Sequence, residues 1–246
     1  MIQMLGSQFK RLAGVLIDPS GATRAAACRA EPGGLLLAVF CAVTALGAAA
    51  LPRQFAVLRA ALSPTGRSEL DVHYQAMRDG LTRVIIADRL VLSPTLLLAA
   101  VLLVLMSEPI LAVARDRRGA IWAMALLGLA PLLVQQVGEL IVTYLAQPGL
   151  HPRPGDAVNL PHRFVTGPLV FWRRDASPPV WFEVINARFN IITLWCAAVW
   201  SVGLRTLDGG KLRIWHVGVP LTCLGVAGVV TWIATPWATS ALLGRP

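Results

Sequence analysis

Long apolar stretches alternate with polar segments along the whole chain. The predicted membrane spans are residues 34–51, 91–114, 120–146, 189–206 and 214–237. As a helix that rises 1.5 Å per residue, the uncharged first span covers about 27 Å, close to the thickness of a thin hydrocarbon core. The pattern predicts an all-α fold, a polytopic membrane helix bundle with about five transmembrane helices.

The N-terminal segment, residues 1–33, precedes the first span and is more polar. Residues 2–17 carry apolar side chains at helical spacing, with Lys10 and Arg11 on other faces. This spacing predicts an amphipathic helix that is too short and too polar to span a membrane. Asp18-Pro19-Ser20 interrupts it, and Asp18 or Ser20 can cap a second helix. We expect residues 1–33 to form a cytoplasmic amphipathic segment.

Two long polar segments interrupt the five-helix transmembrane domain, which we assign to residues 34–237. Apolar residues recur at helical spacing within 52–90, which predicts an amphipathic helix outside the bilayer core. Segment 147–188 holds seven of the 17 prolines, too many for one long helix. We expect both segments on the far side of the membrane, and residues 238–246 as a C-terminal tail.

Composition supports the membrane class and charge indicates an orientation. Apolar residues make up 56% of the chain and charged residues 14%, whereas soluble domains carry about 25% charged residues. Short loops rich in Lys and Arg face the cytoplasm. With five spans, one side gathers Lys10, Arg11, Arg24, Arg29, Arg115, Arg117, Arg118, Arg205, Lys211 and Arg213. This side, with the N-terminus, is therefore predicted to be cytoplasmic, and the Ala/Arg-rich, Lys-poor composition suggests a bacterial inner membrane.

Glu108 is the most distinctive polar residue inside a predicted span. A carboxylate at the centre of a span costs about 2.5–3.5 kcal/mol on insertion scales, so it usually has a partner. Arg205 is predicted at a similar depth near the end of the fourth span, and we predict a structural Glu108–Arg205 contact. A proton or ion site at Glu108 is the alternative.

A second polar group falls in the third predicted span. Gln135 and Glu139 are four residues apart and share one helix face, with Gln136 beside them. Arg188, at the far end of the fourth helix, is the cation expected to accompany Glu139. The group is predicted to pack against a helix or a partner protein.

Motifs for catalysis, metals and nucleotides are not found in the sequence. The four His and four Cys are scattered without metal-ligand spacing. Ser/His/Asp, HExxH, GxGxxG and Walker patterns are absent from the sequence as well. The sequence therefore predicts a protein that is not an enzyme, with no cofactor, no metal site and no nucleic-acid partner.

Three segments resemble Yip1-domain membrane proteins of the bacterial type. The first is IITLWCAAVWSVGLRTL (191–207), which is similar to the family's fourth-helix signature through Trp195, Gly203, Leu204 and Arg205. The others are RGAIWAMALLGLAPLLVQQV, with a mid-span Pro131, and LIDPSGATRAAACRAEPGGLLLAV. The resemblance implies five transmembrane helices, a cytoplasmic N-terminus and no catalysis.

The resemblance also implies a role. Eukaryotic relatives contact Rab-type GTPases, but their Asp-Leu-Tyr-Gly motif is replaced here by Glu31-Pro32-Gly33-Gly34. Some bacterial relatives accompany ABC-type export machinery as an extra membrane subunit. We therefore expect an accessory or scaffold subunit that contacts membrane lipids and a membrane-protein complex, such as ABC transporter subunits. The alternative is a small transporter or channel that uses Glu108 and Glu139.

Overall fold

The structure is a computed structural model, and it describes the following residues: 2–28, 31–62, 72–90, 93–111, 118–146, 157 and 190–243. Within these ranges every regular element is a helix, which confirms the all-α prediction. Three helical stretches are long and apolar enough to cross a membrane: Pro32–Leu62, Arg118–Leu145 and Ile214–Ala234. Two further apolar helices, α5 (Pro94–Ile110) and α10 (Ile191–Leu207), have 17 residues each. The structure thus supports a membrane protein, and the number of five spans stays a prediction.

The chain divides into two compact units, which are described separately. The first unit comprises residues 1–42, 92–134 and 166–232, and the second comprises 43–91, 135–165 and 233–246. The division does not test the predicted organisation, in which residues 34–237 form one domain, and that organisation stays a prediction. The division separates the two ends of the long helix α3 (Pro32–Leu62), and it also falls within α7 (Ala130–Leu145) and α11 (Ile214–Leu243).

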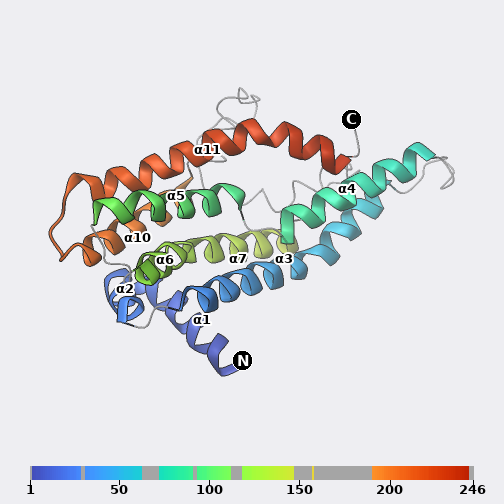
Figure 1. Cartoon of the computed structure of the whole chain (residues 1–246). Helices are drawn as coiled ribbons and strands as arrows, with labels where there is room; N and C mark the ends of the chain where they lie inside the picture. The colour runs from blue at the N-terminus through green and yellow to red at the C-terminus, as the bar shows by residue number, and fades with distance from the viewer. Residues whose placement is uncertain are drawn as a thin grey trace. The chain divides into compact units, whose positions relative to one another are not determined.

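The first unit begins with the two short helices that the sequence predicts. Helix α1 (Ile2–Ile17) is amphipathic and buries Gln8, Leu12 and Val15. Helix α2 (Pro19–Cys28) packs against α6 (Arg118–Leu127) and α10, as Figure 1 shows. Both helices therefore lie on the apolar helices of the unit.

Helices α5 and α11 run antiparallel in the first unit. The hydroxyls of Thr95 and Thr231 lie 2.9 Å apart, and the Cys223 thiol lies 3.6 Å from the Met106 sulfur. Of these two contacts, the one with the higher residue number on α5 has the lower residue number on α11, so the two helices run in opposite directions. The C-terminal end of α5 therefore lies at the same end of the unit as the N-terminal end of α11 and the turn that joins it to α10 (Figure 1).

Helix α6 forms much of the core of this unit. Seven of its ten residues are buried, including Ile121, Met124 and Leu127. Its small residues, among them Ala120 and Ala123, allow neighbouring helices to approach closely, as is common inside membrane bundles. The core thus lies along α6, while α5, α10 and α11 present apolar side chains outward.

The second unit is built on the C-terminal half of α3. This helix continues past Leu51, where the predicted first span ends, to Leu62. A hydrophobic cluster joins it to α4 (Val72–Leu90), and its buried members are Val57, Leu58, Leu62, Ile85 and Ala157. The amphipathic helix predicted within 52–90 is present as α4, with Ile85 on its buried face. Segment 147–188 lies outside the described residues except for Ala157.

Two contacts join α3 to the end of α7 close to a proline inside α3. Pro52 has no N–H to donate to the carbonyl one turn earlier, which disturbs the helix at that point. Close by, the carbonyl of Ala49 accepts a 2.8 Å hydrogen bond from the Tyr144 hydroxyl, and Arg53 donates to the Ala146 carbonyl at 3.5 Å. The Tyr144 and Arg53 side chains thus connect the two helices near Pro52.

Candidate functional site

A break in the helix separates α6 from α7. The N–H of Gly128 still donates to Met124, but the N–H of Leu129 donates to Leu126 rather than to the carbonyl of Ala125. Pro131 follows and has no N–H of its own. The Ala125 carbonyl instead accepts a 2.8 Å hydrogen bond from the indole N–H of the fully buried Trp200 on α10.

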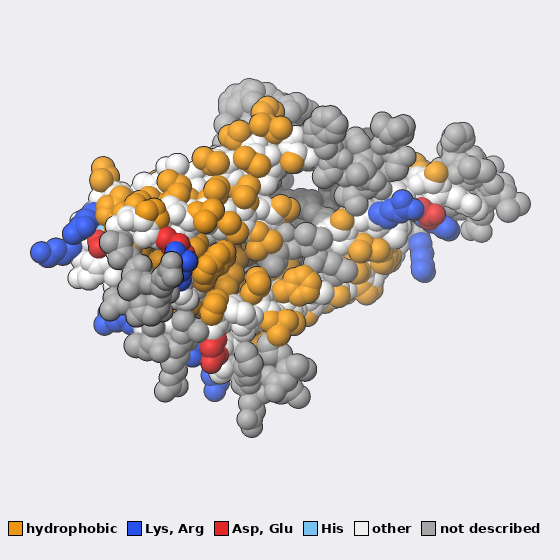
Figure 2. Space-filling model, in the orientation of Figure 1, with side chains coloured by type: hydrophobic (Ala, Val, Ile, Leu, Met, Phe, Trp, Pro, Cys, Tyr) orange, Lys and Arg blue, Asp and Glu red, His pale blue; other side chains and the backbone are white. Residues whose placement is uncertain are grey.

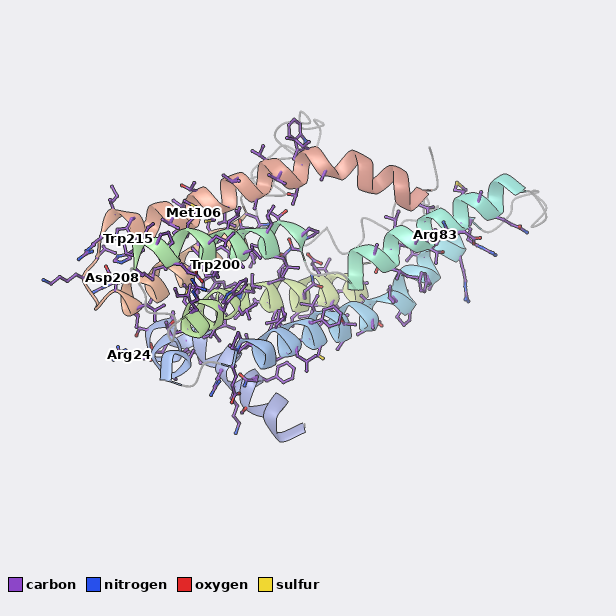
Figure 3. All side chains as sticks on the ribbon, in the orientation of Figure 1. Arg24, Arg83, Met106, Trp200, Asp208 and Trp215 are labelled. Carbon is purple, nitrogen blue, oxygen red and sulfur yellow. The ribbon has the colours of Figure 1, made fainter. Side chains whose placement is uncertain are left out.

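Gly128 makes room for this indole. A Cβ atom at position 128 would collide with the ring of Trp200, including its Nε1 atom. Trp200 is labelled in Figure 3, where it lies among the apolar helices of the first unit. The break, the glycine and the tryptophan therefore form one joint, which we call the Trp200 joint (Ala125, Gly128 and Trp200).

The residues of the Yip1-like signature occupy different environments on α10. Leu204 and Gly203 are buried, and a Cβ at Gly203 would collide with the Met124 side chain on α6. Trp195 is about one-third exposed, at 36%, on the outer face. Arg205 is exposed and its Nε donates to the Gly210 carbonyl at 2.6 Å. Gly203 and Leu204 thus serve helix packing, whereas Arg205 braces the following turn.

Glu108 contacts a different cation from the predicted one. Its carboxylate lies 3.5 Å from the Nε of Arg118, the first residue of α6. Among the ion pairs of the described residues, Glu108 is joined to Arg118 and not to Arg205, so the predicted Glu108–Arg205 contact is corrected. The reason is local: α5 and α6 are consecutive helices, so their facing ends meet, whereas Arg205 has a nearer carbonyl in its own turn.

Gln135 and Glu139 meet as their spacing predicts. The Gln135 amide donates to the Glu139 carboxylate at 2.7 Å, and the side chain of Glu139 is 4% exposed. The Thr143 hydroxyl donates to the Glu139 backbone carbonyl, so this face of α7 is consistently polar. Gln136 is half-buried beside it. Arg188, the cation expected near Glu139, lies outside the described residues.

The turn between α10 and α11 contains a polar cluster that the sequence reasoning missed. The His216 imidazole is fully buried, and its Nε2 lies 3.2 Å from a carboxylate oxygen of Asp208. The same oxygen lies 3.5 Å from the Arg213 guanidinium. The backbone N–H of Arg213 donates to His216 Nδ1 at 2.9 Å. Because Nδ1 accepts a hydrogen bond, the proton is assigned to Nε2, which donates to Asp208.

This cluster caps the N-terminus of α11. His216 is the third residue of α11, and its acceptance of the Arg213 N–H is half of a capping box. Gly209 and Gly210 have φ of 81° and 88°, the left-handed region that favours glycine, and so allow the chain to reverse. The sequence held one indication of this contact: Asp208 and His216 are eight residues apart on either side of a Gly-Gly pair, which is typical of a tight turn.

Two polar contacts order the N-terminal helices. The Gln8 amide donates to the Glu31 carboxylate at 2.8 Å. Asp18 accepts from the backbone N–H of Gly21 and from the Ser20 hydroxyl, both at 2.9 Å, and so acts as the N-cap of α2. The Gly21 N–H, with the Ser20 hydroxyl, holds the pKa of Asp18 below its ordinary value of 3.8.

Within the residues that the structure describes, no group of three or more His, Cys, Asp or Glu side chains is arranged to hold a metal ion. Cys41, Cys196 and Cys223 are free thiols.

Comparison of the chain with known protein families, with curated proteins and with solved structures found no match in any of the three. The likeness to Yip1-domain proteins therefore remains an expectation from the residues quoted above.

Proposed function

We propose that this chain is a non-enzymatic integral membrane subunit that crosses the bilayer five times and binds a larger membrane assembly. The main support for this proposal is that several polar side chains of the first unit make contacts within that unit. Trp200, His216 and Glu108 each contact a helix end or a helix break of the same unit. Polar groups of this kind stabilise a bundle, which is the property that a scaffold subunit needs.

The outer surfaces of the helices support the membrane part of the proposal. Figure 2 shows hydrophobic side chains spread over the visible face of the first unit. On α5, α10 and α11 the exposed members include Leu105, Ile191, Leu194, Val229 and Trp232. Such a continuous apolar face would be unfavourable in water and is suited to lipid or to a partner's helices.

Five crossings follow if the two shorter helices also span. Helices α5 and α10 have 17 residues each, or about 25 Å at 1.5 Å per residue, which suits a thin or locally thinned bilayer. Exposed cations gather at one end of the first unit: Arg24, Arg118, Arg205, Lys211 and Arg213. With the excess of Lys and Arg facing the cytoplasm, this end and the N-terminus face the cytoplasm of a bacterial inner membrane.

The partner is proposed to be an ABC-type export complex, from the resemblance. Full-length tagged protein carrying a photocrosslinking residue at Leu194 or Leu105, both exposed, should crosslink to another membrane protein in cells. The matched control is the same residue at Leu204, which is fully buried in the unit. Recovery in mild detergent as a lone monomer, with no crosslinked partner from either exposed position, would contradict the proposal.

A small transporter or channel is the second candidate, favoured by the Gln135–Glu139 pair, in which Glu139 is buried. In proteoliposomes with a pH-sensitive dye inside, a transporter that uses Glu139 would lose proton flux in Glu139→Gln while its assembly stays intact. Proton flux in Glu108→Gln is measured for comparison. Glu108 is paired with the exposed Arg118, so this variant should keep the flux if Glu139 alone carries it. For a packing subunit we expect no protein-dependent flux, and lower stability or weaker partner recovery in Glu139→Gln.

A further inference from the structure

The turn between α10 and α11 exposes aliphatic side chains directly beside cations. In residues 211–214 the order is Lys211, Leu212, Arg213, Ile214, and all four are exposed. Leu212 is 67% exposed and Ile214 is 93% exposed. We call these four residues the basic turn; Figure 2 shows blue and orange side chains together at this end of the first unit.

The basic turn is held in place by several contacts. Arg205 Nε donates to the Gly210 carbonyl at 2.6 Å, and the Arg213 N–H donates to the buried His216 ring at 2.9 Å. Asp208 contacts both His216 and the Arg213 guanidinium. The exposed Leu212 and Ile214 are thus presented by a turn braced on both sides. In Figure 3, Asp208 and Trp215 mark its place at the end of the unit.

Positive charge exceeds negative charge around this turn. Helix α2, which packs against α10, carries the exposed Arg24. Three nearby acids among the described residues each lie beside a cation: Asp208 contacts Arg213, Glu108 contacts Arg118, and Asp18 lies near Arg24. Lys211 and Arg205 are cations beyond these three pairs. Lys211 is therefore an exposed cation in a region where cations outnumber acids. This favours an anionic ligand.

We propose that the basic turn binds the headgroups of anionic phospholipids at the membrane surface. Lys211 and Arg213 contact the phosphodiester, while Leu212 and Ile214 enter the start of the acyl region. Alternating cations and aliphatic side chains match the layer where phosphate meets hydrocarbon. Trp215, which follows directly, suits the headgroup level. An acidic protein would satisfy the cations but would have to supply apolar cover for Ile214. The inference rests on the proposed membrane function.

The test uses the full chain, purified in a mild neutral detergent, with thermal unfolding as the readout. The probes are short-chain phosphatidylglycerol, phosphatidylcholine with the same acyl chains, and inorganic phosphate. We expect apparent affinity for phosphatidylglycerol to exceed that for phosphatidylcholine about 25-fold, since each of the two cations near an anionic surface contributes about fivefold. Inorganic phosphate should not raise the unfolding temperature, because it offers nothing to Leu212 and Ile214.

Matched variants separate charge from apolar contact. Lys211→Gln should weaken phosphatidylglycerol binding about fivefold and leave phosphatidylcholine binding unchanged. Arg83→Gln removes the same charge from an exposed position on α4 (Figure 3) and should change neither. The double variant Leu212→Ser and Ile214→Ser should weaken binding of both lipids.

Several results would overturn the inference. These are equal affinity for the two lipids, stabilisation by inorganic phosphate as strong as by phosphatidylglycerol, or equal effects of Lys211→Gln and Arg83→Gln. Loss of an acidic protein partner in Lys211→Gln, with lipid preference unchanged, would assign the turn to protein binding instead. Release of the chain from membranes by alkaline carbonate would contradict the proposed membrane function itself, which the lipid comparison alone does not address.

Discussion

The indole N–H of Trp200 donates a 2.8 Å hydrogen bond to the carbonyl of Ala125, across two helices that are far apart in the sequence. The carbonyl needs this donor because the break at Gly128 and Leu129 redirects the backbone N–H that would otherwise reach it. A broken helix inside an apolar bundle is tolerated when side chains satisfy the released backbone groups. Trp200 therefore stabilises the break.

Trp200→Phe should destabilise the protein by about 1–3 kcal/mol, because a buried carbonyl loses its donor while most of the ring volume remains. The measurement is the free energy of unfolding in mixed micelles. Trp195→Phe on the outer face of the same helix is the control, and its effect should stay within about 0.5 kcal/mol. Equal losses in the two variants would show that the hydrogen bond contributes nothing.

Gly128→Ala should be destabilising even though alanine favours helices, because the new methyl group collides with the Trp200 ring. We expect a cost of about 1–3 kcal/mol, the usual range for overpacking a core. Gly225→Ala in α11 is the matched control, since no atom lies within 4 Å of its added Cβ. It should be neutral or stabilising by up to about 1 kcal/mol. A larger loss of stability in Gly225→Ala than in Gly128→Ala would contradict the close packing of Gly128 against Trp200.

Asp208→Ala should weaken the start of α11, because the buried Nε2–H of His216 would lose its acceptor. The expected loss is about 1–3 kcal/mol of unfolding free energy. Asp79→Ala provides the comparison, since Asp79 pairs with Arg78 on an exposed surface and such pairs contribute about 0–1 kcal/mol. A loss at Asp208 no larger than at Asp79 would argue against a structural role for the cluster.

Helix α2 should lose protection from amide exchange when the pH falls through the pKa of Asp18. This pKa lies below 3.8 in the folded protein, because the Gly21 N–H and the Ser20 hydroxyl favour the carboxylate. The stabilisation is therefore present above the pKa of the unfolded chain and is lost as the pH falls through the lower folded value. Asp18→Asn keeps a capping acceptor and should remove the pH dependence. Exchange at the amides of residues 20–22, followed from pH 6 to pH 2 by mass spectrometry, checks this. Identical pH profiles of amide exchange in the unsubstituted protein and in Asp18→Asn would contradict this prediction.

Much of the architecture followed from local pattern. Helical spacing of apolar residues located α1 within residues 2–17, and long apolar runs located α5, α10 and α11. The Gln135–Glu139 contact was predictable for the same reason, since residues four apart lie on one helix face. Asp18 was one of two caps that the sequence allowed, and the structure shows that it caps α2.

Contacts between distant residues required the tertiary structure. Pro131 was visible in the middle of the third predicted span, but nothing in the sequence pointed to Trp200 as the donor for Ala125. Glu108 was correctly expected to have a cationic partner, yet that partner is Arg118 rather than Arg205, because helix packing sets which ends meet. Sequence alone therefore determined an apolar, helical, basic chain and the faces of its helices. The tertiary structure decided which polar groups meet, because a hydrogen bond or ion pair depends on ångström-scale distances that periodicity does not encode.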